Sequence, residues 1–237
     1  MEPRMDQRLA QGHVSAEQID AGLRSHMLSV YNYMGLALAL TGLTAFVTAT
    51  TPAMVQLIFG TPLQWVVMLA PLGFIFFLGA KVRTMSLSAT QITFWAFAVA
   101  MGLSLSAIFL VFTGTSIARV FFITAATFGA MSLYGYTTNR DLSKYGAFLF
   151  MGLIGVVVAM IVNIFLASSA LQFAISVIGV LVFTGLTAYD SQRIKEEYSE
   201  LAGHETTAKM AIMGALSLYL NFINLFMMLL HLFGNRE

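Results

Sequence analysis

The chain carries no Asp, Glu, Lys or Arg between residues 25 and 80, which read SHMLSVYNYMGLALALTGLTAFVTATTPAMVQLIFGTPLQWVVMLAPLGFIFFLGA. A helix that crosses a hydrocarbon core about 30 Å thick needs roughly 20 apolar residues, so this stretch is long enough for two spans. Two Thr-Pro pairs and Gly60 interrupt it at residues 50–62. The stretch therefore predicts two membrane-spanning helices, at residues 27–49 and 63–80.

Five more apolar runs follow, and together with the first two they predict an all-α, polytopic membrane protein with seven transmembrane helices. These runs lack the alternation of barrel strands, and backbone groups in lipid must be satisfied within a helix. We expect a polar cytoplasmic tail over residues 1–24, in which Ser15 could cap a short helix, and one membrane domain over residues 25–237. The five runs cover residues 92–112, 120–136, 148–167, 171–189 and 208–233.

Composition excludes several classes of protein. Of the 237 residues, 58% are hydrophobic and only 10% are charged, with a mean hydropathy of +0.81, which no water-soluble domain shows. The net charge of +1 gives no reason to expect nucleic acid as a partner. There is no cysteine, and no two His residues have the i, i+4 spacing of a zinc helix. We therefore expect the lipid bilayer as a partner and no cofactor.

Lys and Arg are distributed unevenly between the loops, and this asymmetry predicts orientation. With the amino terminus inside, ten of them fall on the cytoplasmic side, and only Arg119 and Arg236 fall outside. We expect a cytoplasmic amino terminus, an external carboxyl terminus and, from the short loops, a bacterial plasma (inner) membrane. The ten inside residues are Arg4, Arg8, Arg24, Lys81, Arg83, Arg140, Lys144, Arg193, Lys195 and Lys209.

The strongest functional candidate is Asp190, in the sequence GLTAYDSQRI at residues 185–194, about one turn inside the cytoplasmic edge. A carboxylate within a span is costly and usually marks an ion path, a proton site or a paired charge. Two interpretations remain open. Asp190 could lie at the interface and bond water or Arg193, or it could face the bundle interior and meet a partner from another helix.

Other polar side chains within or beside the spans are Asn221, Asn224, Asn163, Tyr189 and Tyr219. Asn residues in spans commonly join helices, and we favour that role over pore lining for Asn224 and Asn163. The pair Tyr189 and Asp190 resembles half of an intramembrane aspartyl protease site. That chemistry needs a second aspartate, and no other Asp or Glu lies inside a span, so we do not expect an enzyme.

Small residues also occur at spacings that let helices approach closely. Examples are Gly102 in the third span and Gly129 and Gly135 in the fourth. Such positions more often pack helices than line a pore.

Two motifs resemble the Bax inhibitor-1 family, also called the transmembrane Bax inhibitor motif family. The sequences ALSLYLNFINLF at 215–226 and LLHLFG at 229–234 are similar to its last helix, and AYDSQRI at 188–194 is similar to the end of its sixth. Weaker similarity lies in NIF at 163–165 and MGLSL at 101–105. The chain is identified as a bacterial member of this family, with the match in span count and order extending over nearly all residues after about Arg24.

The resemblance implies a seven-helix bundle with the last helix central, and a calcium leak regulated by protons. In the family, an aspartate on each of the last two helices shares a proton and acts as a gate with a basic residue from the second helix. Asp190 matches the first aspartate, but Asn221 stands at the second position. For the basic residue we select Arg83 over Lys81.

Asn221 should change how such a gate responds to protons. Two close carboxylates cannot both ionise easily, whereas an amide donor favours the ionised form of Asp190. Calcium prefers several oxygen ligands, so Asp190 could form only a weak, transient calcium site. By helical rise, Asn221 lies near the midplane and Asp190 nearer the edge, so contact between them requires tilted or displaced helices.

The sequence therefore predicts a pH-sensitive calcium-leak protein with calcium ions and protons as its ligands. The alternative is a non-conducting regulator that binds a membrane protease or the stress machinery. Secondary transport is a third interpretation, although the two halves show no matching broken helices.

Overall fold

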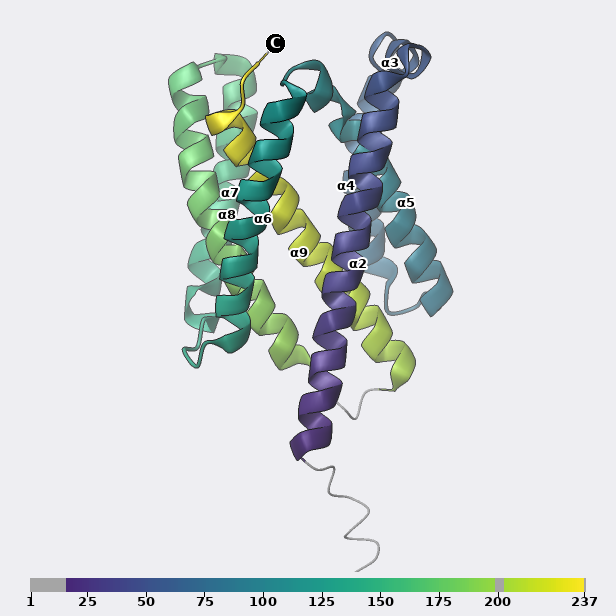
Figure 1. Ribbon diagram of the computed structural model, residues 1–237, viewed down its shortest axis with the longest axis vertical. Helices are drawn as coiled ribbons and strands as arrows, with labels where there is room; N and C mark the ends of the chain where they lie inside the picture. The colour runs from purple at the N-terminus through teal and green to yellow at the C-terminus, as the bar shows by residue number, and fades with distance from the viewer. Residues whose placement is uncertain (1–15, 199–202, 237) are drawn as a thin grey trace, which may run out of the picture.

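The computed structural model describes residues 16–198 and 203–236, which form helices packed roughly along one direction (Figure 1). Within these ranges the β-structure is one isolated bridge, between Phe112 and Arg236. The helices are α2 (Ala16–Thr50), α3 (Pro52–Phe59), α4 (Leu63–Lys81), α5 (Leu87–Leu105), η1 (Ser106–Leu110), α6 (Gly114–Thr137), α7 (Ser143–Leu166), α8 (Ser169–Glu197) and α9 (His204–Phe233).

Seven helical segments among the described residues are long and apolar enough to cross a membrane, which confirms the predicted number of spans. The predicted interruption at residues 50–62 is present, but it contains the short helix α3. Thr51 is extended and Pro52 begins α3, where a missing N–H costs nothing. The first helix begins at Ala16, so it crosses the predicted boundary at residue 24, while Ser15 lies outside the described residues.

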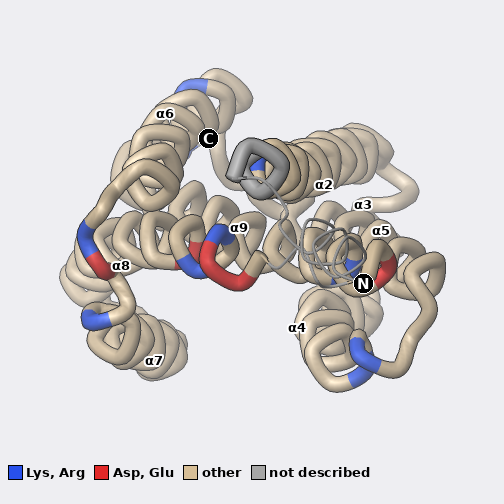
Figure 2. Tube along the Cα trace, turned by 90° about the horizontal axis from the view of Figure 1, so that it is seen from below, with Lys and Arg blue, Asp and Glu red and all other residues tan. Residues whose placement is uncertain are grey.

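Helix α9 lies at the centre of the bundle, as the resemblance implies (Figure 2). In its most apolar window 72% of residues are buried, against 39% in α8 and 6% in α7. It packs against α2, α5, α6 and α8, and side chains such as Leu218 and Leu225 are fully buried. Because α9 is covered on these sides, a polar residue of α9 that faces one of these four helices is shielded from lipid.

Close helix approach explains two of the three glycines singled out above. A Cβ on Gly135 of α6 would overlap the carbonyl of Ala188 on α8, and one on Gly102 would lie 2.6 Å from a Thr44 carbon on α2. Gly129 differs, because a Cβ there would meet nothing within 4 Å. The packing interpretation is therefore confirmed for Gly102 and Gly135 and is wrong for Gly129.

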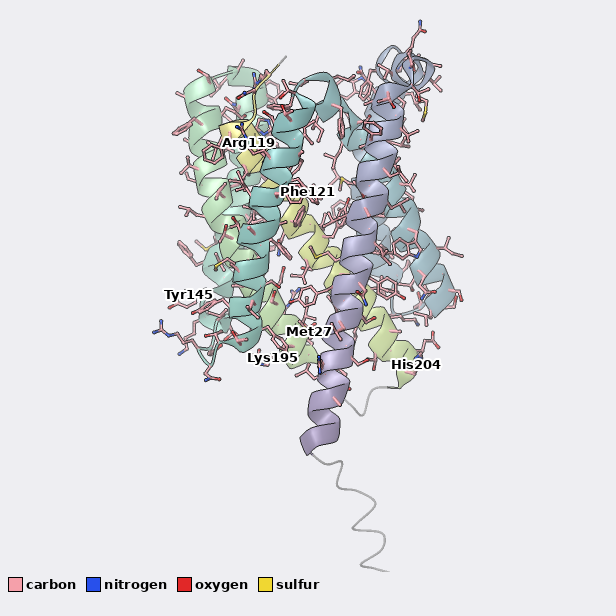
Figure 3. All side chains as sticks on the ribbon, in the orientation of Figure 1. Met27, Arg119, Phe121, Tyr145, Lys195 and His204 are labelled. Atoms are coloured by element: carbon pink, nitrogen blue, oxygen red, sulfur yellow. The ribbon has the colours of Figure 1, made fainter. Side chains whose placement is uncertain are left out.

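Charged residues of both signs gather at one end of the bundle, where α2 begins and α8 ends (Figure 2). We call it the basic end, because eight of the ten described Lys and Arg residues lie there. Lys195 and His204 lie there, whereas Arg119 lies at the opposite end (Figure 3). Helix α2 begins at the basic end and helix α9 ends at the opposite end (Figure 1), as an odd number of spans requires. The basic end holds Arg24, Lys81, Arg83, Arg140, Lys144, Arg193, Lys195 and Lys209.

Candidate functional site

Asp190 lies inside the bundle on α8, only 6% exposed, with both carboxylate oxygens engaged. Its Oδ2 accepts hydrogen bonds from the Ser217 hydroxyl and the Asn221 amide on α9, each at 2.7 Å. Its Oδ1 pairs with the Arg193 guanidinium at 2.9 Å. Arg193 also donates to the Ser217 hydroxyl at 3.3 Å. These four residues form the Asp190 cluster.

Helical spacing and helix packing build this cluster together. Ser217 and Asn221 are four residues apart and lie on one face of α9, and Asp190 and Arg193 are three residues apart on α8. Helices α8 and α9 pack against each other, which brings the two faces into contact. The helical rise predicts that Asp190 and Asn221 lie at different depths in the membrane. The packing of α8 on α9 nevertheless brings their side chains into direct contact.

The charges within the cluster balance. Hydrogen bonds to an ionised carboxylate are charge-assisted, and Asp190 receives one from the cationic Arg193 and two from the uncharged donors Ser217 and Asn221. A buried charge is tolerated only when it is paired and hydrogen-bonded in this way. Calcium could not bind the same oxygens without displacing these donors. Among the described residues there is no group of three or more His, Cys, Asp or Glu that could hold a metal ion.

The structure does not bring Arg83 to Asp190. Arg83 is exposed just beyond the end of α4, and among the described residues the ion-pair partner of Asp190 is Arg193. Both interpretations left open by the sequence apply, because Asp190 pairs with Arg193 on its own helix and also faces Asn221 in the interior. A gating role for any of these residues stays a prediction.

A cleft of about 930 Å³ runs beside the cluster, and we call it the lateral cleft. Figure 2 shows its outer helices, α4 and α7, apart from each other on one side of α9. The lining includes Asp190 and, on α9, Ser217, Asn221 and Asn224. These three α9 residues have i, i+4 and i+7 spacing, so they form one polar stripe about 10 Å long. Helices α5 and α8 complete the wall, with Ser104, Leu105, Leu186 and Tyr189 among its residues.

Asn224 and Tyr189 both line the lateral cleft but make different contacts. The Asn224 amide donates to the Leu220 carbonyl of its own helix at 2.8 Å, so it does not join two helices as we expected. Tyr189 packs against Gly146 of α7, and the Arg193 guanidinium lies 5.9 Å from its ring centre.

Tyr219 and Asn163 make hydrogen bonds that stabilise the fold and do not take part in the Asp190 cluster. The Tyr219 hydroxyl is fully buried and donates to Thr41 of α2 at 2.7 Å, since Thr41 donates its own proton to the Ala98 carbonyl. Asn163 accepts from the Ser168 backbone N–H at 3.0 Å, in the turn between α7 and α8. That turn lies at the end opposite the Asp190 cluster.

Ser217 and Gln192 were not singled out from the sequence. Ser217 could have been found, because it lies one turn before Asn221 and shares its face. Gln192 is buried, accepts from the Leu142 backbone N–H at 2.7 Å and donates to the Arg140 carbonyl at 2.9 Å. It fixes the end of α8 against the loop between α6 and α7, a long-range contact that carries no local signal.

Comparisons with known proteins match this chain to one family profile and to bacterial relatives. The family profile described as "Inhibitor of apoptosis-promoting Bax1" matches residues 23–237. An uncharacterized protein of Rickettsia prowazekii is 50% identical over 92% of this chain and 92% of its own length. The Escherichia coli protein named "Inner membrane protein YbhL" is 46% identical over 94% of this chain and 97% of its own. With seven apolar helices, this similarity supports a multi-pass protein of the inner membrane.

Proposed function

Because this chain belongs to the Bax inhibitor-1 family, we propose that it is a pH-sensitive calcium-leak protein whose gate is the Asp190 cluster. The observation that carries the proposal is the position of the cluster. A buried carboxylate joins α8 to the central helix α9 where a polar stripe lines the lateral cleft. As a leak pathway, the protein needs neither a catalytic residue nor a cofactor.

Protonation supplies a way to loosen this junction. In the described arrangement an ionised Asp190 attracts Arg193 and accepts bonds from Ser217 and Asn221. A proton on the carboxyl removes the attraction to Arg193 and weakens both bonds, since charge-assisted hydrogen bonds are roughly twice as strong as neutral ones. Helices α8 and α9 could then separate at the basic end, and the path along the α9 stripe would open there.

Calcium chemistry fits a transient site better than a storage site. Ca²⁺ takes six to eight oxygen ligands, often from several carboxylates. Asp190, Ser217, Asn221 and Asn224 offer one carboxylate together with hydroxyl and amide oxygens on the lateral cleft. Such a set would hold the ion weakly, which suits permeation. We place the basic end in the cytoplasm, with the amino terminus inside and the carboxyl terminus outside, because cationic loops stay on that side.

One observation favours the alternative, a non-conducting regulator of a membrane protease or of the stress response. Asn221 stands where the resemblance implies a second carboxylate, and every oxygen of Asp190 has a partner. A fully paired cluster could act as a permanent brace between α8 and α9. The protein would then act through the surfaces that this brace holds in place.

Calcium flux into proteoliposomes at several pH values separates these two functions. The native chain should conduct, Asp190→Asn should lose flux or its dependence on pH, and Asn221→Asp should respond more strongly to pH. Asn163→Asp is a matched control, because it adds a carboxylate at the opposite end of the bundle. Flux that is absent, or indifferent to pH and to both cluster substitutions, would rule out the channel and favour the regulator.

A further inference from the structure

A second cavity lies at the basic end, between the last turns of α8 and the first half of α9, and we call it the vestibule. Its volume is about 320 Å³, and its lining includes Glu197 of α8 and Met213 of α9. The vestibule shares three lining residues with the lateral cleft, namely Arg193, Ser217 and Leu220. These shared residues therefore form a partition between the two cavities.

Within this partition, Arg193 lies between two carboxylates on one face of α8. Asp190 is three residues before it and Glu197 is four residues after it, and both spacings place side chains on the same helix face. The Arg193 Nη2 atom lies 2.9 Å from Asp190 Oδ1, and the Nε atom lies 3.7 Å from Glu197 Oε1. Of the two cavities, Asp190 lines the lateral cleft and Glu197 lines the vestibule. The guanidinium thus has one acidic partner facing each cavity.

The hydrogen bond from Arg193 to Glu197 is not formed in this arrangement. The Arg193 Nε atom is buried and has no hydrogen-bond partner among the described residues, since 3.7 Å is too long for one. A buried N–H group without a partner is unfavourable, and a turn of the side chain toward the vestibule supplies one. The Arg193 side chain is 41% exposed, against 8% for Asp190, so the interior does not confine it.

We propose that Arg193 closes the path between the vestibule and the lateral cleft, and that Glu197 is the positioning residue that receives its guanidinium when the path opens. The exchange replaces one ion pair by another on the same helix, so the guanidinium keeps a counter-charge. Asp190 then faces the opening, and a permeating cation takes the place of the guanidinium beside it. This inference rests on the proposed function, because it assigns the cytoplasmic end of that path and provides the displacement that calcium binding requires.

The other charged groups near the partition have partners of their own. On α9, Lys209 pairs with Glu205 at 2.8 Å, and on α8, Lys195 donates to the Tyr136 carbonyl of α6 at 2.9 Å. Helices α4, α5 and α7 contribute only uncharged residues to the lining of the lateral cleft. Within the described chain, no third carboxylate lines either cavity, so the guanidinium alternates between the two on its own helix.

Cysteine accessibility tests the partition, because the chain has no Cys and each variant then carries a single thiol. Met213→Cys places the thiol in the vestibule, and Asn224→Cys places it in the lateral cleft, about 16 Å further along α9. A charged thiosulfonate reagent is added to inverted membrane vesicles, in which modification of Met213→Cys establishes that the basic end is exposed. Lipid excludes this reagent from the open side of the cleft.

In the otherwise native chain, Asn224→Cys should react at least about tenfold more slowly than Met213→Cys. The reagent reaches the cleft only while the partition is open, and a closed state held by one charge-assisted bond is open in at most about one molecule in ten.

Two substitutions change the partition in opposite directions. Arg193→Gln removes the closing charge and should make Asn224→Cys about tenfold more reactive. Glu197→Gln removes the alternative partner and should make it about threefold less reactive, the contribution typical of one partly exposed ion pair. Glu205→Gln is the matched control, since it removes a carboxylate of similar exposure from the same end, 60% against 57%, that pairs with Lys209 instead.

Met213→Cys should keep its reactivity in every background, which shows that the vestibule remains folded. Equal rates for Asn224→Cys and Met213→Cys in the otherwise native chain would overturn the proposal. So would an Asn224→Cys rate that Arg193→Gln leaves unchanged, or one that Glu197→Gln alters no more than Glu205→Gln does. The rates are measured without calcium, so the expected rates in a chain that shows no flux would support the partition and reject the channel.

Discussion

Replacement of Asn221 by Ala should destabilise the protein by about 1.5 kcal/mol. The change removes a 2.7 Å hydrogen bond to an ionised, buried acceptor, and bonds to charged groups contribute roughly 1.5–3 kcal/mol. Interhelical bonds in membrane bundles average nearer 0.6 kcal/mol and reach about 1.7. We expect a value near the upper limit for membranes, because the acceptor is ionised and buried. The cost should not exceed that limit, because Asp190 keeps Ser217 and Arg193 as partners and does not become an unpaired charge.

The assay is reversible unfolding in mixed micelles by denaturing detergent, for the native chain, Asn221→Ala and the control Asn224→Ala. The Asn224 amide bonds only a carbonyl of its own helix, so its loss should cost less than about 0.5 kcal/mol. A double-mutant cycle with Asp190→Asn should show a coupling energy near 1 kcal/mol between Asp190 and Asn221. Equal costs for the two Asn variants, or a coupling energy near zero, would refute this reasoning.

Two further predictions concern other parts of the chain. Gly135→Ala should destabilise the bundle by about 3 kcal/mol in the same unfolding assay, because the new methyl group overlaps the Ala188 backbone. Gly129→Ala on the same helix should be neutral or slightly stabilising, because a Cβ there meets nothing within 4 Å. The second concerns Asp141, whose pKa is lowered mainly by the hydrogen bond from the Ser143 hydroxyl. Its stabilising contribution is therefore present above the pKa of the unfolded chain and is lost as pH falls through the folded one. In an NMR titration Ser143→Ala should raise this pKa toward its ordinary value, and an unchanged pKa would contradict the assignment.

Much of the architecture could be predicted from hydropathy alone. The interruption at residues 50–62 and the number of spans depend on which residues can lie in hydrocarbon. The mean hydropathy of each window of about 20 residues shows this directly. The extension of the first helix to Ala16 could not be predicted in this way, because a helix may continue beyond the membrane where hydropathy gives no signal. Helix α3 was missed for a related reason, since Pro breaks one helix but can begin the next.

The site was predictable in part. Asp190 and Asn221 were selected, and the structure places them in contact, but Arg193 rather than Arg83 pairs with the carboxylate. The choice between these two cations depends on where the end of α4 lies relative to α8, which no local pattern encodes. Gln192 makes contacts over long sequence distances, and its residue type alone gives no reason to select it. Ser217 could have been selected, because it lies one turn before Asn221 on the same face of α9.

By itself, the sequence determined that this protein spans the membrane seven times and that one buried carboxylate must find partners, because the free energy of placing each residue in lipid depends mainly on its own chemistry. Only the tertiary structure decided which donors reach Asp190. It also decided that the polar stripe of α9 faces a cleft open between α4 and α7. Those features depend on the relative tilt and rotation of packed helices, which arise from contacts between residues far apart in the chain.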